Sequence, residues 1–226
     1  MSVIINGTNT PTAGGVTYGN GTEYATTSAG TSGQVLTSAG ASAPTWATMS
    51  AAALTLISTQ TASGSASIAW TGLSGYNKYL LIVDNFVPST GADNLTLVLG
   101  TGAGPTYIAT GYYGSDVYNA SNSSPAGGSN QTNATYIDLN SGNTVDSTAS
   151  YGGFSGELTF INMDASPAAD ARVLWGSVFP TGATIFRQNS GGATVYNNTT
   201  AKTAIKLAFS TRTIASGKAS LYGISS

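Results

Sequence analysis

Apolar and polar positions alternate with a period of two along most of this chain, which is the period of a half-buried β-strand. In residues 204–210, Ile205, Leu207 and Phe209 fall on one side and Lys206 on the other. Residues 78–86 are apolar almost throughout, which predicts a central strand. The pattern predicts strong strands at residues 78–86, 95–99, 156–162, 172–179, 204–210 and 218–224.

Clusters of Gly, Pro, Asn and Ser lie between these strands and predict turns. Residues 49–56 could form a helical turn, but the β-branched continuation to residue 61 favours a strand that opens the main domain. We therefore expect very little helix and an all-β fold, an antiparallel β-sandwich of jelly-roll-like type. The predicted turns lie at residues 88–91, 102–105, 141–143, 180–182 and 216–217.

The predicted core contains the apolar members of each period-two set. These residues are Leu81, Val83, Leu97, Leu158, Phe160, Trp175, Ile205, Leu207, Phe209 and Leu221. One long stretch, residues 119–133, has neither a charge nor a large apolar side chain, and it predicts a long loop.

The pattern changes near residue 50. Before it the predicted strands are short and isolated, so residues 1–50 are expected to form an extended β-strip or shaft and residues 51–226 a sandwich head. The strip has apolar side chains and strand edges but no evident partner in its own sequence, which predicts pairing with sister chains or with another protein. The residues expected to anchor it are Ile4, Ile5, Val35, Leu36 and Trp46. For Trp46 a second interpretation is equally open, in which the ring plugs the base of its own head domain.

Composition limits the chemistry that the chain can carry out. Only 7% of the residues are charged and the net charge is −2, so neutral polar side chains must supply most of the surface. The chain has no Cys and no His, which excludes disulfides, thiolate metal sites and His-based catalysis. There is no apolar run long enough for a membrane span and no signal peptide, and without a basic cluster no nucleic-acid partner is expected.

The few charges are unevenly placed. Residues 79–171 hold eight of the nine acidic residues and no Lys or Arg, whereas residues 172–226 hold six of the seven basic residues and no acid. Acidic middle strands could lie beside basic late strands and form cross-strand pairs. Alternatively, the head has two oppositely charged faces that attract a neighbouring subunit or an anionic surface.

Residues 30–46 read G-T-S-G-Q-V-L-T-S-A-G-A-S-A-P-T-W. This segment resembles one that is common in phage tail fibres and related virion proteins, with the pattern G-T-x-G-Q-V-L-x-S-x-G-x-x-x-P-x-W. Residues 5–8 and 15–22 resemble the amino-terminal segment of such proteins, and residues 214–224 resemble the last hairpin of the β-sandwich that closes many of them. The resemblance implies a virion structural protein whose terminal L-Y-G-I strand packs into the core, and it does not reach residues 100–150.

We find no catalytic constellation and expect neither an enzyme nor a cofactor. A pair of carboxylates, as in glycosidases, would consist mostly of Asp, because Glu23 and Glu157 are the two glutamates. An acidic turn at residues 164–170 could bind calcium, although Asp side chains that cap turns explain it better. Sugar binding needs aromatic faces and hydrogen-bonding groups, and these are concentrated in one segment. Its candidate glycan-binding residues are Tyr112, Tyr113, Asp116, Tyr118 and Asn119.

The sequence therefore predicts a non-enzymatic virion protein of the fibre type on the exterior of a phage particle. It is expected to form a homo-oligomer, in particular a trimer, to contact other virion proteins through its strip, and to bind host-surface polysaccharide through its head. Two alternatives stay open, a capsid decoration or head-fibre protein and a polysaccharide-cleaving tail spike.

Overall fold

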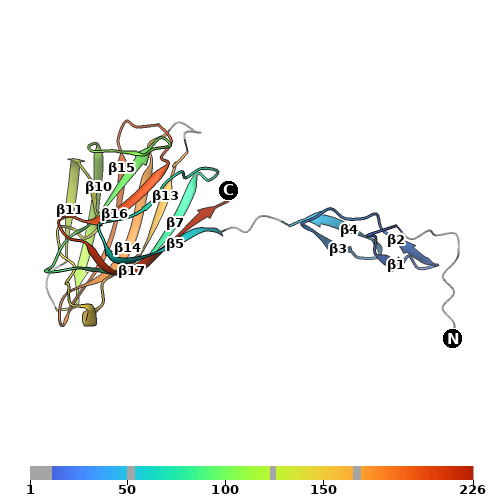
Figure 1. Ribbon diagram of the computed structural model, residues 1–226, viewed down its shortest axis with the longest axis horizontal. Coiled ribbons are helices and arrows are strands. Elements are labelled where there is room, and N and C mark those ends of the chain that lie inside the picture. Colours follow the sequence, from blue (N-terminus) through green and yellow to red (C-terminus); the bar gives the residue numbers. More distant parts are fainter. Residues whose placement is uncertain (1–11, 50–53, 123–125, 165–168, 226) are drawn as a thin grey trace. The chain divides into compact units, whose positions relative to one another are not determined.

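The computed structural model describes residues 12–49, 54–122, 126–164 and 169–225. Contacts divide the chain into two compact units, Met1–Ala52 and Ala53–Ser226, next to the boundary predicted near residue 50. Strands dominate both units (Figure 1). The helix in the described residues is one short 3-10 turn, Ala149–Tyr151, which confirms the predicted scarcity of helix. Across these residues, no helix has the length and apolar character that a membrane crossing requires.

The first unit consists of two small antiparallel hairpins. Strand β1 (Thr17–Gly19) pairs with β2 (Tyr24–Thr26), and β3 (Gln34–Ala39) pairs with β4 (Ser42–Thr48). The prediction that this strip has no partner in its own sequence is therefore wrong. Strands β3 and β4 pair because a two-residue turn reverses the chain after Ala39, with Gly40 at a φ of 69° that favours glycine.

Trp46 closes this first unit on itself. It lies opposite Leu36 across the hairpin, and its indole Nε1 donates a 2.8 Å hydrogen bond to the Ser28 carbonyl. The indole ring lies so close to Gly30 that a Cβ there would be 2.6 Å from Trp46 Cδ2. Glycine at position 30 is therefore required by the close approach of the ring.

The second unit is an antiparallel β-sandwich, as predicted. Its larger sheet has eight strands in the order β11-β10-β15-β14-β13-β7-β17-β5, and its smaller sheet has five, in the order β12-β8-β16-β6 with β9 paired to β8. The larger sheet contains β5 (Leu54–Ser65), β7 (Lys78–Pro88), β10 (Tyr112–Ala120), β11 (Gly127–Ala134), β13 (Phe154–Ile161), β14 (Arg172–Gly182), β15 (Ile185–Val195) and β17 (Ile214–Ile224). The smaller sheet contains β6 (Ile68–Trp70), β8 (Leu95–Thr101), β9 (Thr106–Tyr107), β12 (Ile137–Asp138) and β16 (Ala204–Phe209).

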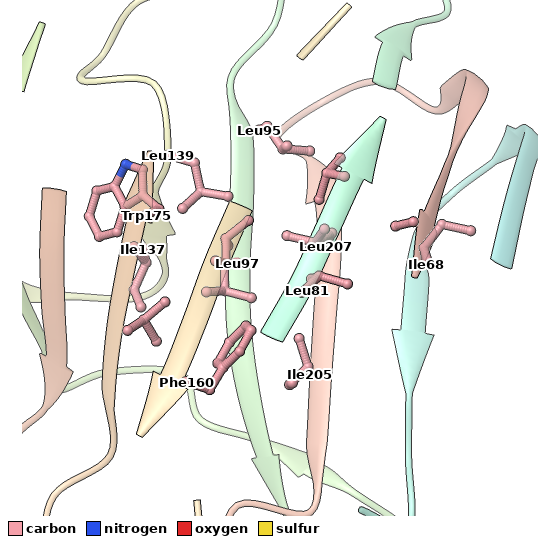
Figure 2. Close-up of a cluster of buried hydrophobic side chains, with 14 of the residues drawn as sticks. Ile68, Leu81, Leu95, Leu97, Ile137, Leu139, Phe160, Trp175, Ile205 and Leu207 are labelled. Atoms are coloured by element: carbon pink, nitrogen blue, oxygen red, sulfur yellow. The ribbon is translucent and has the colours of Figure 1, made fainter. Parts of the chain in front are cut away.

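The core lies between the two sheets, and every residue predicted for it is buried. One row of paired residues crosses the middle of the larger sheet and faces inward: Leu221, Leu81, Leu158 and Trp175. Figure 2 shows Leu81 gathered with Leu97 and Leu207 from the smaller sheet. Because Leu221 is fully buried, the terminal strand packs into the core as the resemblance implied.

The structure corrects two sequence predictions of turns and loops. Residues 119–133, expected to form a long loop, instead belong largely to a hairpin in which β11 pairs with β10 at the edge of the sheet. The polar side chains of β11 do not prevent the pairing of β11 with β10. An edge strand is paired along one side only, and its other side is in contact with solvent. Residues 216–217, expected to form a turn, lie inside β17 as a bulge, with Gly217 at a φ of 121°.

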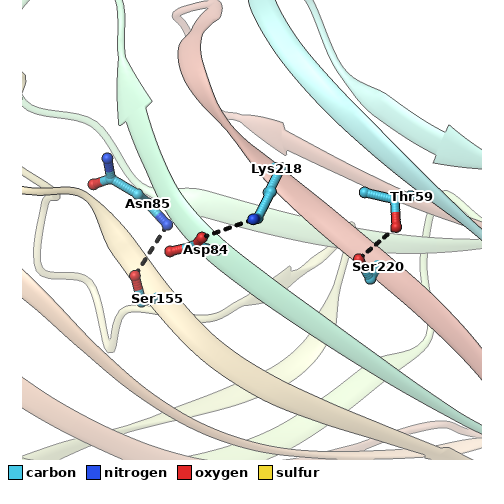
Figure 3. A network of polar contacts seen from close by, with 6 residues as sticks. All are labelled: Thr59, Asp84, Asn85, Ser155, Lys218 and Ser220. Atoms are coloured by element: carbon cyan, nitrogen blue, oxygen red, sulfur yellow. Dashed lines mark hydrogen bonds and ion pairs between the residues drawn. The ribbon is translucent and has the colours of Figure 1, made fainter.

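A polar network crosses the outer face of the larger sheet, which is the face turned away from the core (Figure 3). Lys218 and Asp84 are cross-strand neighbours and form an exposed ion pair at 3.7 Å. At this position an acidic middle strand does lie beside a basic late strand, as one of the two interpretations of the charge pattern predicted. Exposed pairs of this kind contribute little to stability.

Phe209→Ala should destabilise the head, because the ring is 4% exposed within the core cluster. Loss of a buried Phe typically costs about 3–5 kcal/mol of unfolding free energy. Urea denaturation measures the change, and Val117→Ala, a truncation at an exposed strand position, is the control. An unchanged midpoint for Phe209→Ala would mean that this strand has the opposite register.

Trp46→Ala should loosen the first unit and leave the head intact, because the described contacts of the indole lie on Ser28 and Gly30. Hydrogen exchange should become faster over residues 28–48 and stay unchanged in the head. Val35→Ala, a truncation of an exposed side chain on the same hairpin, is the control. A head that melts earlier in Trp46→Ala would instead support the interpretation of Trp46 as a plug of the head.

Candidate functional site

The five residues predicted to bind a glycan all lie on strand β10, but they do not form one surface. The strand pairs without interruption with β15 from Tyr112 to Ala120, so its side chains alternate strictly between the two faces. Tyr112, Asp116 and Tyr118 point inward, whereas Tyr113 and Asn119 point to the outer face. The predicted cluster is therefore divided by the sheet itself.

The inward members of this set have structural roles. Tyr112 is fully buried, and its hydroxyl accepts a 2.8 Å hydrogen bond from the Leu99 amide. Burial raises the pKa of the Tyr112 phenol to about 12. The Asp116 carboxylate accepts hydrogen bonds from the amide and the hydroxyl of Ser129, which ties β10 to β11. The Tyr118 ring packs under the Arg187 guanidinium at 4.5 Å.

The predicted anchoring residues are only partly within the described chain. Val35 and Leu36 are 40% and 39% exposed, so their side chains are available to a partner, while Trp46 is half-buried in its own unit. Ile4 and Ile5 lie outside the described residues. Val35 and Leu36 are thus the described residues on which the anchoring prediction now rests.

A different place in the head combines concavity with polar chemistry. A pocket of about 290 Å³ lies among three loops, which join β6 to β7, β13 to β14 and β15 to β16. We call it the three-loop pocket. It is lined by Leu73, Ser74, Gly75, Tyr76, Tyr79, Met163, Asp164, Ala201, Lys202 and Thr203.

Backbone hydrogen bonds hold the three loops against one another. The Leu73 amide donates to the Thr203 carbonyl at 2.9 Å, and the Lys202 amide donates to the Met163 carbonyl at 2.6 Å. The Met163 amide in turn donates to the Asn77 carbonyl at 3.1 Å. Each loop is thus bonded to another, so the pocket is preformed by the main chain and not by side chains alone.

Lys202 is the buried charge at this site, with 2% of its surface exposed. Its ammonium donates to the carbonyl oxygens of Asn198, at 2.8 Å, and Thr200. Burial lowers the pKa of Lys202 below its ordinary value of 10.5, and the Asp170 carboxylate opposes that shift. The loop from 197 to 200 is therefore closed by a cation, and Asp170 binds its Asn197 and Asn198 amides.

Two tyrosines and a carboxylate also line the pocket. The rings of Tyr76 and Tyr79 meet edge to face, with centroids 5.8 Å apart. Burial, together with the nearby Tyr76 and Asp164, raises the pKa of the Tyr79 phenol, so it stays neutral. Asp164 lines the same pocket, and its backbone amide is held by the Asn77 side chain.

This combination suits a neutral polyhydroxyl ligand. The ring of Tyr76, which is only half-buried, can pack against the C–H face of such a ligand, while a carboxylate and the Ser74 hydroxyl can bond its hydroxyl groups. The acidic turn at residues 164–170 was also a calcium candidate. Among the described residues no group of three or more His, Cys, Asp or Glu side chains could hold a metal ion. Asp170 instead caps a neighbouring turn, as the sequence analysis favoured.

Sequence reasoning missed the aromatic and basic members of this pocket. Tyr76, Tyr79 and Lys202 follow no shared motif, and the pocket forms because three loops far apart in the sequence meet at one end of the sandwich. The nearest signal was Lys202 itself, a lone cation in a run of Asn, Thr and Ala before a predicted strand.

The stability of the protein should depend on the titration of Lys202. Because its pKa is lower in the folded state than in the unfolded chain, the unfolded chain binds more protons between the two values. The unfolding free energy of the wild type, relative to Lys202→Gln, should therefore rise between pH 7 and about 10.5. Lys218→Gln, the same change at an exposed ammonium, is the control. A difference that stays flat with pH would contradict the buried environment of Lys202.

Comparison with family models, with curated proteins and with solved structures finds no match to this chain.

Proposed function

We propose that this chain is a non-enzymatic structural protein of a phage virion, of the fibre type. Its hairpin unit anchors it to other virion proteins, and its sandwich head is displayed on the exterior of the particle, where it binds host-surface glycan. The three-loop pocket is the single observation that carries the binding role, because it joins an aromatic wall to a carboxylate and hydroxyls. The proposal includes a homo-oligomer, in particular a trimer formed through the hairpin unit.

The separate hairpin unit supports the anchoring role. It has its own internal contacts, and it leaves Val35 and Leu36 exposed on one strand. Glu23 is its one charged residue, so attachment through it relies on backbone pairing and apolar contacts. Attachment should then depend little on salt, because there is almost no charge to screen.

A capsid decoration or head-fibre protein would share this fold and differ in its location. The resemblance of residues 30–46 to virion segments fits both, and the position of the protein on particles seen by electron microscopy separates them. A polysaccharide-cleaving spike is the third candidate. Incubation of the purified protein with host polysaccharide would then release new reducing ends, which a binding protein does not produce.

Tyr76→Ala and Asp164→Ala should each weaken glycan binding by about tenfold or more, because each removes one half of the recognition, the ring face or the carboxylate. The measurement is binding of the purified full chain to an array of bacterial surface polysaccharides. Tyr136→Ala, which truncates an exposed tyrosine away from the pocket lining, is the control.

Equal binding by the wild type and both pocket variants would contradict a glycan site at this pocket. Loss of binding in the control as well would place the binding surface elsewhere on the head. Each variant is first compared with the wild type in thermal unfolding, so that a folding defect is not mistaken for a binding defect.

A further inference from the structure

The outer face of the larger sheet is unusually apolar for a solvent-facing surface. Large apolar side chains that alternate away from the core are between 37% and 60% exposed there. They are Ile82, Val117, Leu174, Val178 and Phe186. Several exposed apolar side chains on one sheet face favour an interaction site there.

The same face contains a groove of about 690 Å³ over β13, β14 and β15. Gly176 lies at its centre, and a Cβ there would meet no atom of the described residues within 4 Å. Leu174 and Val178 flank this glycine along β14, and Glu157 and Ser190 are its partners on the neighbouring strands. The surface therefore has a hole at Gly176 directly beside a projecting apolar side chain, Leu174.

The charges on this face are separated along the strands. Lys78 and Arg172 lie in one row of the sheet, each paired with Ile161 on β13. Asp84 lies further along the same strand as Lys78, opposite Lys218 on β17, and Glu157 lies in the middle of β13, opposite Ile82. One row of the face is therefore basic, whereas Asp84 lies in a different row and is paired with Lys218.

We propose that the outer face binds the outer face of a second copy of this chain. The two copies are related by a two-fold axis that lies between the two faces, parallel to the sheets and perpendicular to the strands. Such an axis, placed at the level of residue 175, stacks β14 on β14 in opposite directions. The row of Leu174 then lies over the row of Gly176 in the other copy, so each leucine enters the hole of its partner. The same operation brings each Lys78 over Asp84 and each Leu80 over Ile82.

The charges select this arrangement over the other face-to-face one. A two-fold axis parallel to the strands would keep each row over itself, so the basic row of Lys78 and Arg172 would face its own copy. Like charges brought together at an interface are unfavourable. The perpendicular axis instead separates the two basic rows, places each Lys78 over Asp84, and repeats each contact twice, as a two-fold interface must.

This inference is independent of the proposed function. A two-fold contact cannot lie within a ring of three, so it would join heads of two separate oligomers if the hairpin unit forms a trimer. Breaking the contact then halves the mass of the oligomer in solution, whether the starting species is a dimer or a pair of trimers. Failure of the two-fold contact and failure of the trimer are thus distinguishable by mass.

Light scattering of the full chain over a range of concentrations tests the contact. Lys78→Asp should weaken association by about tenfold or more, because it places two carboxylates together, and Lys78→Asp with Asp84→Lys should restore it. Gly176→Leu should also abolish the association by filling the hole. This change does not threaten the fold, because a Cβ at Gly176 would meet no described atom within 4 Å.

Arg212→Asp is the matched charge reversal, since Arg212 is exposed and lies on the loop between β16 and β17, outside the strands of this face. It should leave the mass unchanged. A wild-type mass that does not vary with concentration and is not halved by Gly176→Leu would overturn the proposal. So would a double variant that fails to recover the association lost in Lys78→Asp.

Discussion

The register of the eight-stranded sheet is the constraint on which the rest of this structure depends. One inward row pairs residues of four neighbouring strands: Leu221, Leu81, Leu158 and Trp175. Because side chains alternate along each strand, this row determines which neighbouring residues point to the core and which point to the outer face. A slip of one residue in any of these strands would exchange its buried and exposed side chains. The same register that builds the core therefore also composes the outer face, including the position of Gly176 beside Leu174.

The sequence was sufficient for the parts of the fold in which burial alone decides. Ile205, Leu207 and Phe209 alternate with polar positions, and each proved to be buried because half-buried strands need that pattern. Burial gives no such signal in β11, whose residues are Gly, Ser, Asn, Gln, Thr and Ala. That strand forms because its backbone pairs with β10, and backbone pairing leaves no mark in hydropathy.

The residues of the candidate site could not be predicted from the sequence, for a related reason. Tyr112 and Asp116 are close in the sequence and both carry groups that can bind a sugar, but both lie on the inward side of β10 and are buried. Tyr79 and Lys202 are far apart in the sequence, and backbone bonds among three loops bring them to one pocket. Proximity in a β-sandwich is set by which strand ends meet, and a single sequence does not specify that directly.

The scarcity of charge links the two surfaces that the head presents. With only 7% charged residues, few Lys or Glu side chains are present to protect an exposed sheet face from association. In the proposed two-fold contact, the charges on the outer face therefore select the orientation of the two copies, while apolar side chains supply the contact. In the three-loop pocket the one cation of the described lining does not face a partner, because the Lys202 ammonium binds the carbonyl of Asn198 in its own loop. The lining near Tyr76 is neutral or acidic. A surface built from neutral polar groups can thus hold a self-association face and a ligand pocket on one small domain, provided that its few charges are placed where they discriminate.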